Sequence, residues 1–168
     1  ARRLYLKNGC EGIIAFGGGS PMDCAKAAGA RVMNPNQSVS QMRGELKIRH
    51  KLPPFFAVPT TAGTGSETTL AAVVTNMQTH EKYAINDPKL RPKYAVLDPE
   101  LTTGLPQKIT STTGMDALTH AVEAYIGLSG TKSTNDYAEK ATKLIFENLE
   151  TAYNDGKNLQ ARENMLVA

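Results

Sequence analysis

Residues 12–32, GIIAFGGGSPMDCAKAAGARV, contain the stretch that decides the fold. The apolar run 12–16, with two isoleucines, predicts a strand. Three glycines follow directly, and the small-residue segment 24–32 predicts a helix. A strand, a glycine loop and a helix in this order are typical of an α/β domain. Glycines let the backbone approach a pyrophosphate closely, and the first N–H groups of a helix attract the anion.

A simpler interpretation of this turn needs no ligand. Ser20 and Asp23 are spaced as a helix-capping pair, and Pro21 suits the first helical position. The spacing of the glycines matches neither the G-x-G-x-x-G dinucleotide fingerprint nor a P-loop. From these residues alone, a phosphate site and a plain helix cap both stay open.

A second small-residue loop follows the predicted strand 55–59. Residues 60–69, TTAGTGSETT, hold five threonines, one serine and two glycines, which offer hydroxyl and amide groups without bulk. The alternative is a flexible polar loop. Two such loops, each after a strand, are what the carboxyl edge of a doubly wound sheet presents to a nucleotide.

Three further segments complete the predicted α/β part. Residues 70–75 and 82–85 flank a polar turn and predict a β-hairpin, on which Lys82 is either a phosphate or ribose contact or simply solvated. Residues 94–99 predict another strand. The polar, proline-punctuated stretch 34–54, which includes His50, predicts a surface connection.

After Pro106 only helical patterns remain. In residues 114–125, GMDALTHAVEAY, Asp116 and His120 are four positions apart, so their side chains share one helical face and could bind one divalent metal ion. An accidental pair on a helix is the alternative, because two ligands alone do not hold a catalytic metal. Residues 133–152 predict an amphipathic helix capped by Ser133, and another helix follows from Asn158.

Composition limits the class of protein. The 168 residues are 40% hydrophobic and 21% charged, and the net charge of +3 is scattered, so neither nucleic acid nor a membrane is an expected partner. No apolar run is long enough for a membrane span or a signal peptide, which favours a cytoplasmic protein. Cys10 and Cys24 are too few for a disulfide framework and are expected to be buried, reduced thiols.

Five motifs together carry a family resemblance. GGGSPMDCAK at 17–26, PTTAGTGSETT at 59–69, EKYAI at 81–85, YAVLDPEL with LTTGLP at 94–106 and GMDALTHAVEAY at 114–125 occur in the order found in the iron-containing alcohol dehydrogenases. From the first to the last, they span residues 17–125, which is most of the chain. The segment is thus identified as resembling the middle of such an enzyme, in keeping with a start and an end that lack helix start and stop signals.

The resemblance implies the fold and the cofactors. It implies a truncated doubly wound α/β dinucleotide-binding domain at residues 1–104 and the first helices of an all-helical metal-binding domain at 105–168. Cofactors of the family are NAD or NADP and one divalent metal, usually iron and sometimes zinc. The implied cofactor-binding residues are Gly18, Gly19, Ser20, Asp23, Thr60, Thr61, Thr69, Lys82 and Leu101, and the implied metal ligands are Asp116 and His120.

The function implied by the resemblance is hydride transfer between NAD(P) and a small alcohol, aldehyde or ketone, in a full-length protein that forms a homo-oligomer. The family's two further histidine ligands lie beyond residue 168, so we expect the isolated segment to bind metal weakly and to be inactive. Three alternatives stay open: a non-catalytic nucleotide-binding module, a related enzyme such as a glycerol dehydrogenase or a dehydroquinate synthase, and a segment that only packs with a partner copy.

Overall fold

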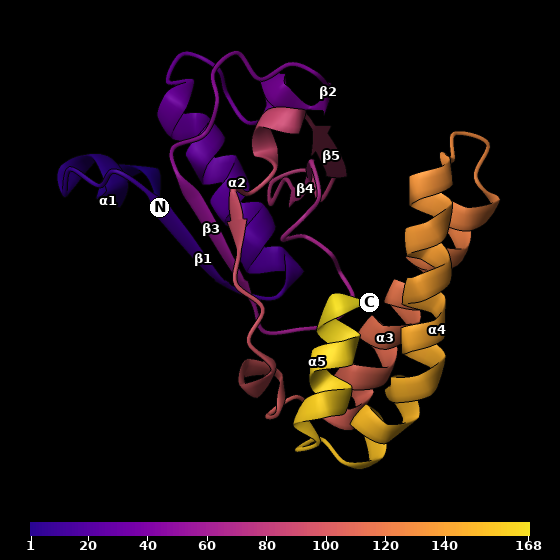
Figure 1. Ribbon diagram of the computed structural model, residues 1–168. Helices are drawn as coiled ribbons and strands as arrows, with labels where there is room; N and C mark the ends of the chain where they lie inside the picture. Colours follow the sequence, from indigo (N-terminus) through magenta and orange to yellow (C-terminus); the bar gives the residue numbers. More distant parts are fainter. The chain divides into compact units, whose positions relative to one another are not determined.

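The computed structural model describes all 168 residues, which form two compact units (Figure 1). The first unit comprises Ala1–Pro59 and Ser66–Val96. The second comprises Thr60–Gly65 and Leu97–Ala168. The short loop Thr60–Gly65 therefore belongs to the second unit, although the chain on both sides of it belongs to the first.

A parallel sheet forms the base of the first unit. Its strand order is β1 (Ile13–Gly17), β3 (Phe55–Pro59) and β6 (Tyr94–Ala95), and Ile13 is paired with Phe55. Helix α2 (Gly19–Met33) follows β1 and packs against it, as expected for a parallel crossover. The predicted α/β fold with a parallel sheet is confirmed. Strand β6 is shorter than the predicted 94–99, because only its first two residues pair with β3.

The predicted hairpin is also confirmed and belongs to a second sheet. Strands β4 (Ala71–Thr75) and β5 (Lys82–Asn86) are antiparallel, and β2 (Gly44–Glu45) adds in parallel on the other side of β5. Strand β4 packs against α2 as well, so this helix contacts both sheets.

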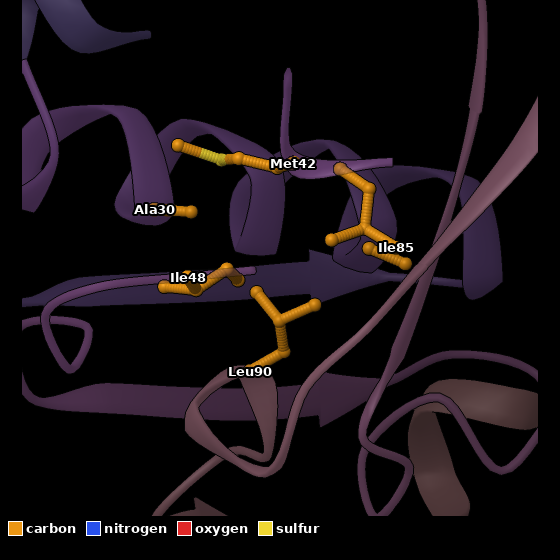
Figure 2. Close-up of a cluster of buried hydrophobic side chains, with 6 residues drawn as sticks. Ala30, Met42, Ile48, Ile85 and Leu90 are labelled. Atoms are coloured by element: carbon orange, nitrogen blue, oxygen red, sulfur yellow. The ribbon is translucent and has the colours of Figure 1, made fainter. Parts of the chain in front are cut away.

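The core of the first unit corrects the prediction for residues 34–54. We expected a surface connection, but Met42 in the 3-10 helix η1 (Ser40–Met42) and Ile48 are fully buried in a cluster with Ala30, Ala72, Ile85 and Leu90 (Figure 2). Hydrogen bonds from polar side chains of this stretch accompany the burial of Met42 and Ile48. Asn34 and Gln37 are buried and bond to the backbone of residues 50 and 47, which satisfies polar groups beside the apolar cluster.

The N-terminal helix α1 (Arg2–Lys7) ends at its C-cap Asn8, which is followed by Gly9 at a positive φ. The burial predicted for the two cysteines was wrong, since both Cys10 and Cys24 are exposed, although both are free thiols as predicted. Cys24 has apolar neighbours in sequence. Helical geometry nevertheless turns it away from the face that carries Met22 and Ala30 into the core.

The second unit is helical, as predicted. A 3-10 helix, η3 (Pro99–Thr102), leads into α3 (Gln107–Ile126), α4 (Lys132–Asn154) and α5 (Leu159–Val167), and α4 packs against both other helices. Its buried cluster consists of Ala62, Ile145, Ala152, Ala161, Met165 and Leu166. No helix of the chain has both the length and the apolar character that a membrane span requires.

The start of α4 differs from the prediction. Ser133 is not the cap, because the helix begins one residue earlier and Thr131 is its N-cap. The hydroxyl of Thr131 accepts from the Thr134 amide, and the Thr134 hydroxyl accepts from the Thr131 amide. This reciprocal capping box satisfies the backbone amides of Thr131 and Thr134 at the start of the helix.

Arg162 connects helix α5 to α3 and to the turn before α5. Arg162 on α5 is only 3% exposed; its Nε donates to the Gly156 carbonyl at 3.0 Å and its Nη1 donates to the Thr110 hydroxyl at 2.8 Å. Burial lowers the pKa of this guanidinium, against a smaller opposing effect of Asp155. Arg162 therefore ties α5 to α3 through its bond to Thr110.

Candidate functional site

The glycine turn after β1 begins helix α2 earlier than predicted. Gly17 adopts φ +143°, which only glycine reaches readily, Gly18 is the N-cap and Gly19 is the first helical residue. The cap carries no side-chain hydrogen bond, and Ser20 is exposed within the first turn. The predicted capping pair of Ser20 and Asp23 was therefore wrong, and the first amides of α2 have no side-chain partner at their cap.

Asp23 instead joins α2 to the segment that follows the second loop. Its Oδ1 accepts from the Ser66 hydroxyl at 2.8 Å, and its Oδ2 accepts from the backbone amide of Val73 at 3.1 Å. Both carboxylate oxygens are thus used within the first unit. Asp23 holds strand β4 and the turn before it against the helix.

Lys26, one helical turn after Asp23, is fully buried, with 0% exposure, as is Asp87 elsewhere in the first unit. Its Nζ donates to the Ser66 hydroxyl at 3.3 Å, to the Thr69 carbonyl and hydroxyl at 3.1 and 3.0 Å, and to the Ala71 carbonyl at 2.8 Å. Burial lowers the pKa of this ammonium to about 8, although the carboxylates of Asp23 and Glu67 act in the opposite direction.

Glu67 is the third charged member of this cluster. Burial raises the pKa of its carboxyl, while a bond from its own backbone amide and the charge of Lys26 lower it by smaller amounts. Its Oε2 is buried and has no hydrogen-bond partner. A buried carboxylate oxygen without a hydrogen-bond partner is costly, and the charge of Lys26 offsets part of that cost.

Sequence reasoning did not single out Lys26, Ser66 or Glu67. One pattern could have identified Lys26. It is a lysine among alanines and glycine, and it lies three positions after Asp23, on the same helical face as that carboxylate. Ser66 and Glu67 gave no signal of their own. Their partners on α2 are 40 or more residues away in sequence.

The other predicted cofactor residues of the first unit are Thr69 and Lys82. Thr69 is partly buried and accepts from Lys26. Lys82 is exposed at the start of β5, where it pairs with Thr75 across the hairpin. The structure joins Thr69 to Asp23 through Ser66 and Lys26, whereas Lys82 makes no contact with that network.

The second unit holds the remaining predicted cofactor residues. Thr60 and Thr61 begin the loop Thr60–Gly65, and the hydroxyl of Thr61 is buried without a hydrogen-bond partner. Leu101 is partly buried in η3. A buried hydroxyl without a partner is rare in proteins, and it is the kind of group that a bound ligand would satisfy.

The two predicted metal ligands lie on the predicted helix, α3. Asp116 Oδ2 and His120 Nε2 are 3.7 Å apart, and the two side chains are 50% and 62% exposed. This places a carboxylate oxygen and an imidazole nitrogen side by side on one accessible helix face. No group of three or more His, Cys, Asp or Glu side chains that could hold a metal ion exists in this chain.

The fold and these residues define the class: an α/β unit with a strand, glycine turn and helix, followed by a helical unit with an Asp/His pair. Models of known families match both parts. Residues 1–99 match the iron-containing alcohol dehydrogenase model, and residues 110–168 match the C-terminal model of the Fe-containing alcohol dehydrogenase family. The chain belongs to the iron-containing alcohol dehydrogenase family.

Individual relatives support the same assignment. The chain is 46% identical over 95% of its length to the protein named probable alcohol dehydrogenase EutG of Salmonella typhimurium, and 39% identical over 98% to the NAD-dependent methanol dehydrogenase of Bacillus methanolicus. The solved structure of an alcohol dehydrogenase from Oenococcus oeni matches 99% of the chain with a TM-score of 0.95 at 39% identity. The chain spans 40 to 43% of the length of these three proteins.

Proposed function

We propose that this chain is part of a cytoplasmic, metal-dependent oxidoreductase that interconverts a small alcohol and an aldehyde or ketone by hydride transfer with NAD(P). The observation that carries the proposal is the pair of Asp116 and His120, whose ligand atoms lie 3.7 Å apart on an accessible face of α3 in a chain of this family. Because both side chains are at least half exposed, their ligand atoms are open to a metal ion.

The donor set suits one divalent metal ion. A carboxylate oxygen and a neutral imidazole nitrogen are ligands for iron(II) and for zinc, and family membership favours iron. Two donors are fewer than such metals usually take from protein, so the remaining ligands would come from outside these 168 residues. A metal bound here would polarise the alcohol oxygen as a Lewis acid.

The nucleotide is proposed to bind through backbone amides and threonine hydroxyls. The amides of Gly18, Gly19 and Ser20 would donate hydrogen bonds to its pyrophosphate oxygens, because they lie at the positive end of the dipole of α2. Asp23 would stabilise this turn through its bonds to Ser66 and Val73.

The remaining proposed contacts are side chains. The hydroxyls of Thr60, Thr61 and Thr69 would bond to phosphate or ribose oxygens, Lys82 would add a positive charge, and Leu101 would supply an apolar contact. The NAD dependence of the methanol dehydrogenase relative supports NAD as the nucleotide, with NADP as the alternative.

The division of this family's proteins into two domains would also apply to this chain. We assign residues 1–104 to the dinucleotide-binding domain and residues 105–168 to the start of the metal-binding domain. The full protein would act on a small alcohol or aldehyde as a homo-oligomer.

The test uses the natural polypeptide, whose intact mass is measured first and compared with the 18.1 kDa of these residues. The protein is stripped of metal, reloaded with Fe²⁺ or Zn²⁺ and assayed for NADH and NADPH formation from short alcohols and diols. We expect turnover only in the reloaded samples. NAD binding without any metal-dependent turnover would instead identify a non-catalytic nucleotide-binding protein.

A further inference from the structure

Lys26 holds one short segment of the first unit in place. All four oxygen atoms within reach of its Nζ belong to residues 66–71, and they include the hydroxyl and the carbonyl of Thr69. Strand β4 begins at Ala71, and the Leu70 carbonyl before it already accepts from the Asp87 amide at 3.0 Å. The bonds from this one ammonium group add to the backbone bonds that fix the segment.

Packing alone does not explain a lysine at this position. Met22, Ala27 and Ala30 surround it on the buried face of α2, where an apolar side chain of similar length would avoid the cost of burying a charge. What a lysine adds is three N–H donors directed at acceptors of the 66–71 segment. The side chain is thus suited to fixing that segment, and the carboxylates of Asp23 and Glu67 offset part of its charge.

The hydrogen bond from Lys26 to Thr69 also determines whether the Thr69 hydroxyl can donate to another group. An ammonium can only donate, so the Thr69 oxygen accepts from Lys26 at 3.0 Å. The hydroxyl hydrogen must then point to a different acceptor. Thr69 is partly accessible, so a ligand oxygen could receive this hydrogen bond.

We propose that Lys26 is a positioning residue for cofactor binding, which holds the 66–71 segment and presents the Thr69 hydroxyl as a hydrogen-bond donor to a phosphate oxygen of the dinucleotide. The inference rests on the proposed function. It assigns to Lys26 no contact with the cofactor and no part in hydride transfer. Its effect is confined to the affinity for the nucleotide.

The test measures NAD affinity by calorimetry, together with kcat and the KM values for NAD and alcohol, in the natural polypeptide and its variants. Lys26→Met should raise the Kd and KM for NAD roughly tenfold, the size expected for losing one good hydrogen bond, and leave kcat and the KM for alcohol unchanged. Thr69→Val should show a similar loss, and Thr69→Ser, which keeps the hydroxyl, should stay within about twofold of the wild type.

A double variant and a control separate positioning from general stability. If Lys26 acts through Thr69, adding Lys26→Met to Thr69→Val should weaken NAD binding by no more than about a further twofold. The control is Asn34→Leu, which also removes a buried polar side chain at the other end of α2. It should lower stability and leave the Kd for NAD unchanged.

Each outcome decides between the two proposals. A wild type that binds NAD, with Lys26→Met binding it equally well, overturns the role of Lys26 and leaves the proposed function intact. A wild type with no NAD affinity overturns the proposed function and the role of Lys26 with it. Should Lys26→Met not fold, equal affinity of Thr69→Val and the wild type would by itself overturn the inference.

Discussion

Gly63 lies directly against the backbone carbonyl of Thr113 on α3, so closely that a Cβ atom on residue 63 would overlap the carbonyl oxygen. The glycine also has φ +141°, a conformation that other residues rarely adopt. This contact explains why the loop Thr60–Gly65 belongs to the helical unit. It also places Thr60 and Thr61 by a backbone contact instead of leaving them on a flexible polar loop.

Replacing Gly63 with alanine should destabilise the helical unit by about 2–4 kcal/mol, because the strained backbone and the overlap with a rigid carbonyl both add cost. Urea unfolding followed by far-UV circular dichroism measures the change. The matched control is Gly104→Ala, since a Cβ at Gly104 meets nothing within 4 Å. Equal midpoints for the two variants would show that the loop yields freely at Gly63.

Replacing Asp116 with alanine should reduce Fe²⁺ affinity in the natural polypeptide by more than roughly 100-fold. Mutation of a residue that only hydrogen-bonds to a metal ligand already lowers metal affinity by about 10–100-fold. NAD affinity should stay within about twofold, because the cofactor contacts do not involve this side chain. Calorimetric titration gives both values. Asp136→Ala, which removes an exposed carboxylate from α4, serves as the control. Unchanged metal affinity in Asp116→Ala would contradict the ligand assignment.

Replacing Arg162 with methionine should lower the free energy of unfolding by about 2–3 kcal/mol, because the buried Thr110 hydroxyl and the Gly156 carbonyl lose their charged donor. Thermal unfolding compares it with Lys140→Met, the same kind of exchange at an exposed position of α4. A loss no larger than that of Lys140→Met would mean that water replaces the arginine at little cost.

The pKa of Lys26, lowered to about 8 by burial, predicts how stability depends on pH. Between about pH 8 and the ordinary value of 10.5, the folded chain has released this proton while the unfolded chain still holds it. Unfolding then takes up a proton, so the contribution of Lys26 to the free energy of unfolding rises with pH across this window. Below about pH 8 the cost of burying the charged ammonium is present in full.

Comparison of the wild type with Lys26→Met, in urea unfolding from neutral pH to pH 10.5, isolates this contribution from other titrating groups. The charged groups that act on Lys26 are Asp23 on its own helix and Glu67 on the 66–71 segment. Strands β1 and β4, which pack against α2, carry no charged residue. The elements α1 and η2 also pack against α2. They lie near Arg31 and Ala30, four or more positions after Lys26. Parallel pH profiles for the two proteins would refute the shift.

The outline of the fold could be predicted from local patterns. The apolar run before the glycines, the alternation in the hairpin, and the three- and four-residue spacing in α4 each depend only on side chains a few positions apart. The Asp116 and His120 pair is equally local, since one helical turn suffices to bring the two together. Errors in local detail arose where several residues could serve one role, as when Thr131 instead of Ser133 capped α4.

The sequence by itself thus determined the order of elements, the parallel α/β unit followed by helices, and the positions that carry the family resemblance. Only the tertiary structure decided that Met42 and Ile48 are core residues, that Thr60–Gly65 packs with the helices, and that Lys26 and Glu67 share a buried cluster. These features join residues 40 or more positions apart or depend on which face of an element meets a neighbour. Periodicity records the shape of one segment, whereas burial and long-range hydrogen bonds arise only when segments pack together.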